Sequence, residues 1–147
     1  MMRILVLNGP NLGRLGRRQP EIYGYVTLPE ILATLRERAA DDGHEIADLQ
    51  TNHEGVLIDR LEQRDYDAIL INPGAWTHYS YAIRDALAAS DVNVAEIHIS
   101  EVSEREPFRQ INVLDGVCAH QVTGKGWMGY LAALDWLIEN SAPRRIA

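Results

Sequence analysis

Short apolar runs alternate with longer segments of helical periodicity along the chain, and this alternation constrains the fold most strongly. Residues 4–7 and 68–71 contain no polar side chain, as expected for strands covered on both faces. Between them, apolar residues recur at helical spacing over 28–39, after a Thr-Leu-Pro-Glu sequence that is typical of a helix start. Strands that alternate with helices favour a parallel sheet built from right-handed βαβ units.

The complete pattern predicts an α/β fold. We expect five strands, at residues 4–7, 44–50, 68–71, 92–99 and near 113–122. We expect helices at residues 28–39, 54–64, 77–90 with Thr77 as the cap, and 127–138. Such a series fits a flavodoxin-like doubly wound, five-stranded parallel sheet of order 2-1-3-4-5 with helices on both faces. We therefore predict a single catalytic domain over residues 1–147.

A loop at residues 8–24 follows the first strand. Its glycines and prolines predict an absence of regular structure, and a loop of this length in a compact domain is usually functional or disordered. It carries Arg14, Arg17, Arg18 and Tyr23, which is poor chemistry for a linker. We interpret it as a cationic flap over the end of a strand.

Composition excludes several classes of protein. A net charge of −7 argues against a nucleic-acid-binding protein. No apolar run approaches the ~20 residues of a membrane span, and the run before Asn8 is too short for a signal peptide. Cys118 is the single cysteine, so no intrachain disulfide is possible, which fits a reducing compartment. We expect a cytoplasmic protein.

The basic residues limit the chemistry further. Of the 14 lysines and arginines only Lys125 is a lysine, and a guanidinium does not deprotonate in proteins. Imine chemistry would therefore depend on Lys125 alone. The five histidines lack metal-ligand spacing, and the glycines of the first loop lack the dinucleotide fingerprint. We expect no metal, no cofactor and no imine.

Polar residues follow three strands that are expected to be neighbours. In a sheet of this order, ligands bind beyond the carboxyl ends of the strands, near the switch between the first and third. The residues at or just after the ends of strands 1, 3 and 4 are Asn8, Asn11, Asn72, His78, His98, Ile99 and Ser100. We expect them to share one crevice.

Tyr23 beside Arg18 is a candidate general base. A tyrosine hydroxyl is almost wholly protonated at neutral pH. A guanidinium ~4 Å away, at an effective dielectric of about 20, is worth about 4 kcal/mol, which makes a phenolate accessible. Alternatively, Tyr23 anchors the loop and Arg18 is a solvated charge.

Glu96 and His98 are a candidate acid pair. Residues two apart in a strand point to the same face, so the carboxylate would hold the imidazole and favour its cation. The alternative is a hydrogen-bonded histidine at a strand end.

Three further groups are candidates for ligand binding. Asn72 and His78 flank a helix N-terminus, which suits anionic or hydroxyl-rich ligands, although His78 alternatively only packs there. Asp85 lies two helical turns after His78 on the same face, or is a plain solvated acid. Arg105 and Arg109, four residues apart, either clamp a ligand or belong to a solvated turn.

Five motifs resemble those of the type II 3-dehydroquinate dehydratases, in the same order and over nearly the whole chain. They are Asn-Gly-Pro-Asn-Leu-Gly with Arg18 and Tyr23-Gly24 at 8–24, Gln-Thr-Asn-His-Glu-Gly at 50–55, Asn-Pro-Gly-Ala-Trp-Thr-His at 72–78, Glu-Ile-His-Ile-Ser at 96–100, and Arg-Glu-Pro-Phe-Arg at 105–109. The resemblance implies anti elimination of water from 3-dehydroquinate through an enolate, giving 3-dehydroshikimate, without metal or cofactor. It also implies a homododecamer built from four trimers.

The resemblance assigns roles to eleven residues. Tyr23 would remove the C2 proton with Arg18 stabilising its phenolate, Asn11 would orient a water against the enolate, and His98, supported by Glu96, would protonate the departing C1 hydroxyl. Asn72, His78 and Arg109 would hold substrate hydroxyls, Ile99 and Ser100 would meet the carboxylate, and Asp85 would reach in from a neighbouring subunit.

The sequence also departs from the family pattern. Gln19 stands where glutamate is usual, Glu101 stands where asparagine is commoner, and residues 111–126 differ from the usual sequence. A non-catalytic flavodoxin-like module that binds a small anion is one alternative, since fold does not fix function. A lyase for a related cyclic polyol acid is another. A role in aromatic biosynthesis and one in quinate breakdown are equally compatible with these residues.

Overall fold

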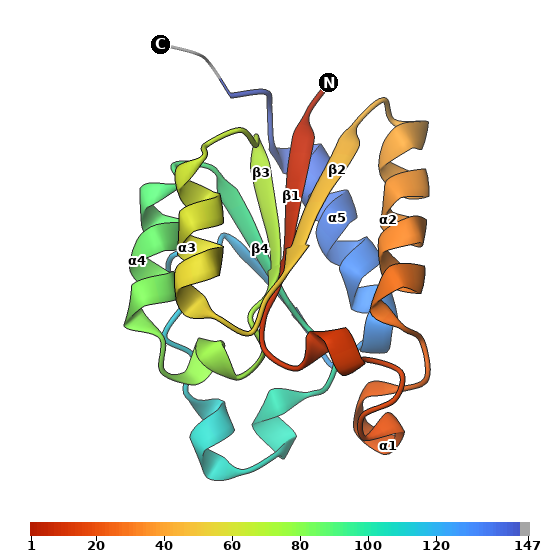
Figure 1. The fold of residues 1–147 in the computed structure, drawn as a ribbon, viewed down its shortest axis with the longest axis vertical. Helices are drawn as coiled ribbons and strands as arrows, with labels where there is room; N and C mark the ends of the chain where they lie inside the picture. Colours follow the sequence, from red (N-terminus) through yellow and green to blue (C-terminus); the bar gives the residue numbers. More distant parts are fainter. Residues whose placement is uncertain (145–147) are drawn as a thin grey trace.

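The computed structural model describes residues 1–144 and has a five-stranded parallel sheet at its centre (Figure 1). The strands are β1 (Arg3–Asn8), β2 (Glu45–Gln50), β3 (Ala68–Asn72), β4 (Asn93–His98) and β5 (His120–Thr123). Their order in the sheet is β2-β1-β3-β4-β5, and every neighbouring pair is parallel. The predicted flavodoxin-like topology is confirmed.

Helices cover both faces of the sheet, with α2 (Leu28–Asp41) and α5 (Gly129–Asn140) on one face and α3 (Glu54–Glu62) and α4 (Tyr81–Ala89) on the other (Figure 1). The period of two in a strand explains the two layers, because Ile4 and Val6 of β1 pack under α2 and α5 while Leu5 and Leu7 pack under α3 and α4. All four side chains are 0% exposed. The polar groups at the strand end are therefore held on a rigid support.

The predicted cap of α2 is confirmed, but the predicted cap of α4 is wrong. The Thr27 hydroxyl accepts a hydrogen bond from the backbone N–H of Glu30 at 3.4 Å. For α4 the cap is Ser80, whose hydroxyl accepts from the N–H of Ile83 at 3.1 Å. Thr77 instead belongs to the 3₁₀ helix η2 (Gly74–His78), and its hydroxyl donates a hydrogen bond to Glu96 in β4.

The first loop and the last strand also differ from the sequence prediction. The loop at residues 8–24 contains two short helical turns, η1 (Leu12–Arg14) and α1 (Pro20–Tyr23), because positive φ angles at Asn11 and Gln19 turn the chain into each of them. The last strand is shorter than expected and begins at His120, because the preceding residues form turns.

The carboxyl ends of the strands meet at the lower end of the molecule in Figure 1. Asn8 of β1 stands opposite Asn72 of β3 in the register, and the backbone N–H of Gly9 bonds to the Asn72 carbonyl at 2.8 Å. Three further 3₁₀ helices lie in the connections, namely η3 (Val102–Glu104), η4 (Pro107–Gln110) and η5 (Gly126–Met128). None of the helices in residues 1–144 is long and apolar enough to span a membrane.

Candidate active site

A cavity of about 180 Å³ opens beyond the carboxyl ends of β1, β3 and β4. Nine of the eleven predicted site residues line it: Asn11, Arg18, Tyr23, Asn72, His78, His98, Ile99, Ser100 and Arg109. Arg105 lines it as well. Glu96 lies behind His98, and Asp85 lies elsewhere on the surface. The cavity therefore brings together residues from the loop after β1, from η2 and from the segment after β4.

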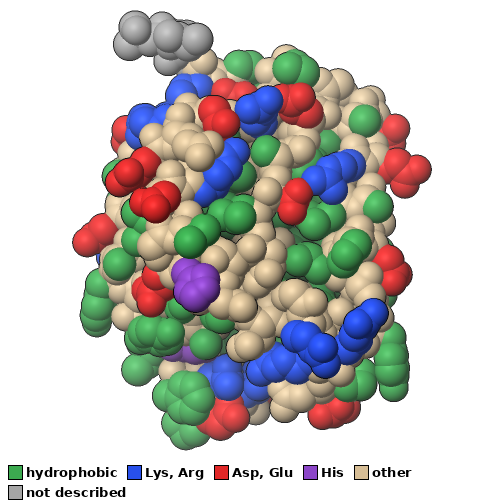
Figure 2. Space-filling view, in the orientation of Figure 1, with side chains coloured by type: hydrophobic (Ala, Val, Ile, Leu, Met, Phe, Trp, Pro, Cys, Tyr) green, Lys and Arg blue, Asp and Glu red, His purple; other side chains and the backbone are tan. Residues whose placement is uncertain are grey.

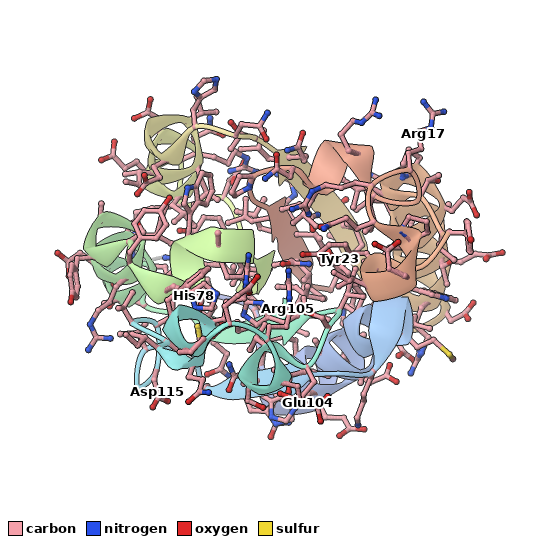
Figure 3. The ribbon with its side chains drawn as sticks, turned by 90° about the horizontal axis from the view of Figure 1, so that it is seen from below. Arg17, Tyr23, His78, Glu104, Arg105 and Asp115 are labelled. Atoms are coloured by element: carbon pink, nitrogen blue, oxygen red, sulfur yellow. The ribbon has the colours of Figure 1, made fainter. Side chains whose placement is uncertain are left out.

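Two arginines surround the Tyr23 side chain. Arg105 donates a hydrogen bond from Nη1 to the Tyr23 hydroxyl at 2.8 Å. Arg18 lies over the ring, with its Cζ atom 5.0 Å from the ring centroid, and no hydrogen bond from it to the hydroxyl is formed. Figure 3 shows Tyr23 and Arg105 near the middle of this end of the molecule with His78 close by, whereas Arg17 points outward. The two cations stabilise negative charge on the phenol oxygen.

The turn α1 positions Tyr23 as its last residue. The backbone N–H of Tyr23 bonds to the carbonyl of Gln19 at 3.0 Å, and the ring packs against the edge of the hydrophobic core. Gly16 lets the loop fold back, because its φ is 89° and an added Cβ would lie 2.7 Å from the carbonyl oxygen of Tyr25. The half-buried tyrosine is thus held by backbone contacts on a surface segment.

Glu96 and His98 form the second functional pair, at the end of β4. His98 Nε2 and Glu96 Oε2 are 2.5 Å apart, and the two side chains are only 5% and 1% exposed. Thr77 donates to Glu96 Oε2 at 2.6 Å, and Asn112 donates to both carboxylate oxygens at 3.1 Å. Since Nε2 is engaged by Glu96, Nδ1 is the ring nitrogen left for a ligand.

This environment keeps Glu96 charged. Burial by itself would raise its pKa, but the hydrogen bonds from His98, Thr77 and Asn112 outweigh burial and hold the pKa below its ordinary value. A buried carboxylate that accepts several hydrogen bonds stabilises a neighbouring imidazolium. The pair therefore holds the His98 ring in a fixed orientation beside the cavity.

The environment of His78 favours a neutral ring. Its Nδ1 lies 2.7 Å from the carbonyl oxygen of Ile111, so Nδ1 carries the hydrogen and Nε2 is an acceptor. Burial lowers the pKa of His78 more than the bond to Ile111 raises it. A neutral imidazole at this position suits a ligand hydroxyl group.

Several other residues of the cavity lining are polar or positively charged. The backbone N–H of Asn11 bonds to Asn52 Oδ1 at 3.0 Å, which ties the loop after β1 to the end of β2. Arg109 pairs with Glu106. Figure 2 shows Lys and Arg side chains gathered across the lower part of this face, around the segment that carries η1 and α1. Although the chain has a net charge of −7, the cavity region is locally cationic and suits an anionic ligand.

Glu101 and Gln19 lie at the margins of this arrangement. The hydroxyls of Ser103 and Thr123 donate to Glu101, at 3.0 Å each, and these bonds lower its pKa. Gln19 is exposed and makes no side-chain hydrogen bond with any residue in 1–144. Neither departure from the family pattern removes a group from the main cavity.

Asp85 is separated from the other predicted residues. It is exposed on α4, and its side chain forms no hydrogen bond or ion pair with a residue of 1–144. Within one chain the structure therefore does not bring Asp85 to the cavity.

The sequence does not predict the contacts that support Tyr23 and Glu96, namely the bond from Arg105 to Tyr23 and the bonds from Thr77 and Asn112 to Glu96. The sequence suggests a role for Arg105 only together with Arg109, because no local spacing indicates its contact with Tyr23. Within residues 1–144, no group of three or more histidine, cysteine, aspartate or glutamate side chains is arranged to hold a metal ion.

A doubly wound sheet with a cationic cavity at its switch point is typical of α/β proteins with a site for a small anionic ligand. The family model described as Dehydroquinase class II matches residues 2–138. The chain belongs to this family.

Individual relatives agree with the family assignment. The chain is 54% identical over 139 residues to a 3-dehydroquinate dehydratase of Roseiflexus castenholzii, covering 93% of this chain and 88% of the relative. It is 47% identical over 143 residues to that of Herpetosiphon aurantiacus, covering 96% and 99%. The crystal structure of type II dehydroquinase from Butyrivibrio crossotus superposes with a TM-score of 0.90 at 47% identity, covering 93% of this chain and 97% of that one.

Proposed function

We propose that this chain is a hydro-lyase that converts 3-dehydroquinate to 3-dehydroshikimate by anti elimination of water. The observation that carries the proposal is that one cavity contains a tyrosine bonded to a guanidinium and a histidine bonded to a buried carboxylate. Removal of a proton next to a ketone, followed by loss of a β-hydroxyl group, needs one base and one acid. Relatives that bear the name of this enzyme support the choice of substrate.

Tyr23 is the proposed base. As a phenolate it takes the C2 proton of the substrate, and the C–H bonding electrons move onto the ketone to form an enolate. Arg105 and Arg18 offset the negative charge that the phenolate carries before this step. Asn11 lies at the cavity wall, where it would orient a water toward the enolate oxygen.

His98 is the proposed acid. When the enolate collapses, the C1–O bond breaks, a C1–C2 double bond forms, and the departing hydroxyl takes a proton from His98 to leave as water. Glu96 holds the imidazole in place and stabilises its cation before the transfer. Proton return from Tyr23 to His98 regenerates both groups, so the overall reaction releases one water and needs no external oxidant or reductant.

The other lining residues are proposed to hold the substrate. Asn72, His78 and Arg109 suit its ring hydroxyls, and the strand end at Ile99 and Ser100 suits its carboxylate. The proposed assembly is a dodecamer of four trimers, in which Asp85 of one chain would reach the cavity of its neighbour. The exposure of Asp85 and its lack of partners within residues 1–144 support such a contact.

The test is direct. Purified protein is mixed with 3-dehydroquinate, and the ultraviolet absorbance of the conjugated enone product is followed, with Tyr23→Phe as the comparison. We expect turnover by the wild type and a loss of at least about 100-fold in kcat for the variant, with retained substrate binding. Binding without turnover by the wild type would favour a non-catalytic module, and faster turnover of another cyclic polyol acid would reassign the substrate.

A further inference from the structure

A fully buried tyrosine connects the ends of two strands behind the cavity. Tyr130 is the second residue of α5 and is 0% exposed. Its hydroxyl donates to Asn8 Oδ1 at 2.6 Å and accepts from Asn72 Nδ2 at 2.9 Å. The sequence pattern indicates only that Tyr130 belongs to the apolar face of the last helix. The reaction proposed above assigns no role to its hydroxyl.

The start of α5 is built to bring this tyrosine close to the sheet. Gly129 precedes it, and a Cβ atom added there would lie 2.7 Å from Cδ1 of Ile97 in β4. Any side chain at this position would require the Ile97 side chain to move. The tyrosine ring then lies in the core, and its hydroxyl is at the polar strand ends.

The contact fixes the amide plane of Asn72. Asn72 Nδ2 is engaged by Tyr130, and Asn72 Oδ1 accepts from the backbone N–H of Gly74 at 3.1 Å. An amide group has two N–H donors and two acceptor lone pairs, so one of each is left for a ligand in the cavity that Asn72 lines. With both ends of the amide held, this remaining donor and acceptor have a fixed direction.

The hydroxyl is suited to this task because it stays protonated. Burial raises the pKa of Tyr130 well above its ordinary value. The group therefore remains both a donor to Asn8 and an acceptor from Asn72 over the whole working pH range. A phenylalanine would fill the same space but would leave two buried amide groups without their partner.

We propose that Tyr130 is a positioning residue that orients Asn72 for substrate binding. The inference rests on the proposed function, in which Asn72 holds a substrate hydroxyl. Asn72 is proposed to hold a substrate hydroxyl and not the reacting atoms, so loss of its orientation is expected to raise KM and to leave kcat nearly unchanged.

Tyr130→Phe tests this inference, with Tyr66→Phe as the matched control. Tyr66 is also buried, at 2% exposed, and its hydroxyl donates to the Leu61 carbonyl at 2.7 Å away from the cavity. Both variants are expected to lower the thermal unfolding temperature. Only Tyr130→Phe is expected to raise KM, by about three- to tenfold. An equal effect of the two variants on KM would overturn the proposal.

A double-mutant cycle separates positioning from general destabilisation. In an Asn72→Ala background, Tyr130→Phe should leave KM unchanged, because the group that it orients is absent. A rise by the same factor in both backgrounds would overturn the proposal. If Tyr130→Phe does not fold, Asn8→Ala removes the acceptor of the same hydroxyl and is expected to raise KM in the same way, and an unchanged KM would count against the proposal.

A crystal structure of Tyr130→Phe gives a readout that does not depend on activity. We expect the Asn72 amide to rotate from its bond with Gly74 or to occupy two orientations. An unmoved amide would overturn the positioning role even if the enzyme is active. Absence of turnover in the wild type would instead overturn the proposed function and leave the structural result to be judged separately.

Discussion

Arg105 donates a hydrogen bond of 2.8 Å to the Tyr23 hydroxyl, although the two residues are 82 positions apart in the sequence. Arg18, only five residues from Tyr23 along the chain, lies over the ring instead. The phenol oxygen therefore receives its direct cationic contact from the segment after β4, which also supplies part of the cavity wall. The same contact therefore holds the loop at residues 8–24 against this segment and would stabilise the proposed phenolate.

Arg105→Gln is predicted to lower kcat by about 10- to 100-fold, because a hydrogen bond to a charged group is worth about 1.5–3 kcal/mol. Arg17→Gln is the matched control, since Arg17 is exposed on the same loop as Tyr23 and points outward. Steady-state kinetics with 3-dehydroquinate measure the effect. An equal loss of kcat in both variants would show that Arg105 acts only through its positive charge and not through its hydrogen bond to Tyr23.

Glu96→Gln is predicted to reduce the free energy of unfolding at pH 7 by roughly 1–3 kcal/mol, because a hydrogen-bonded buried charge is removed. The pKa of Glu96 is lower in the folded protein than in the unfolded chain, so its stabilisation is present above the unfolded value of about 4.3. It is lost as the pH falls through the lower, folded value. The gap between wild type and variant should therefore shrink in acid.

Urea unfolding at pH 7 and at pH 3.5, with fixed protein concentration, measures this difference. Glu37→Gln is the control, because Glu37 is exposed on α2, and we expect no change from it at either pH. A gap that stays constant from neutral to acid pH would show that the carboxylate charge of Glu96 does not contribute to stability.

His78→Ala is predicted to raise KM by up to about tenfold, which corresponds to the loss of one neutral hydrogen bond. The lowered pKa of His78 keeps the ring neutral at pH 7, with Nε2 as the acceptor. In the wild type, KM should thus rise only below about pH 6.5, where the ring begins to gain a proton. The variant should lack this rise.

KM measured from pH 5 to pH 8 tests the role of His78. His53→Ala serves as the control, since His53 is exposed and lies outside the cavity. A wild-type KM that stays level through this range, together with a normal KM in His78→Ala, would remove His78 from the binding site.

The fold was predictable because local patterns determine it. The apolar run at the start of the chain and the Thr27 cap each act over a few residues, and the order of the strands follows from the alternation of helix and strand. The cap of α4 was not predictable in this way. Thr77 has the right residue type, but Glu96, 19 positions further on, accepts its hydroxyl hydrogen, and Ser80 caps the helix instead.

The predicted residues at the strand ends share a cavity because the topology brings those ends together, with the exception of Asn8, which is buried and accepts a hydrogen bond from Tyr130 instead of lining the cavity. The groups that support them were not predictable, since they depend on tertiary contacts. Tyr130 reaches Asn8 across 122 positions, and it resembles any other aromatic residue on an apolar helix face. The role of Asp85 cannot be inferred from the contacts within one chain, because this exposed residue is proposed to act on a neighbouring chain.

Mixed oligomers test the proposed role of Asp85. Tyr23→Phe and Asp85→Asn are each predicted to be nearly inactive alone, because one lacks the base and the other lacks the carboxylate that is proposed to reach the neighbouring cavity. Unfolded together in equal amounts and refolded, they form sites at random. A site is complete when its own chain carries Tyr23 and its neighbour carries Asp85, which is expected for about a quarter of the sites.

Recovery of about a quarter of the wild-type kcat per chain is therefore the predicted result, measured against each variant refolded alone. Because Asp85 is exposed on α4 and is not part of the cavity lining of its own chain, recovery of activity requires a neighbouring chain. No recovery, with oligomers shown to be mixed by mass spectrometry, would mean that Asp85 does not complete a neighbouring site. Full activity of Asp85→Asn alone would exclude any role for this carboxylate in the reaction.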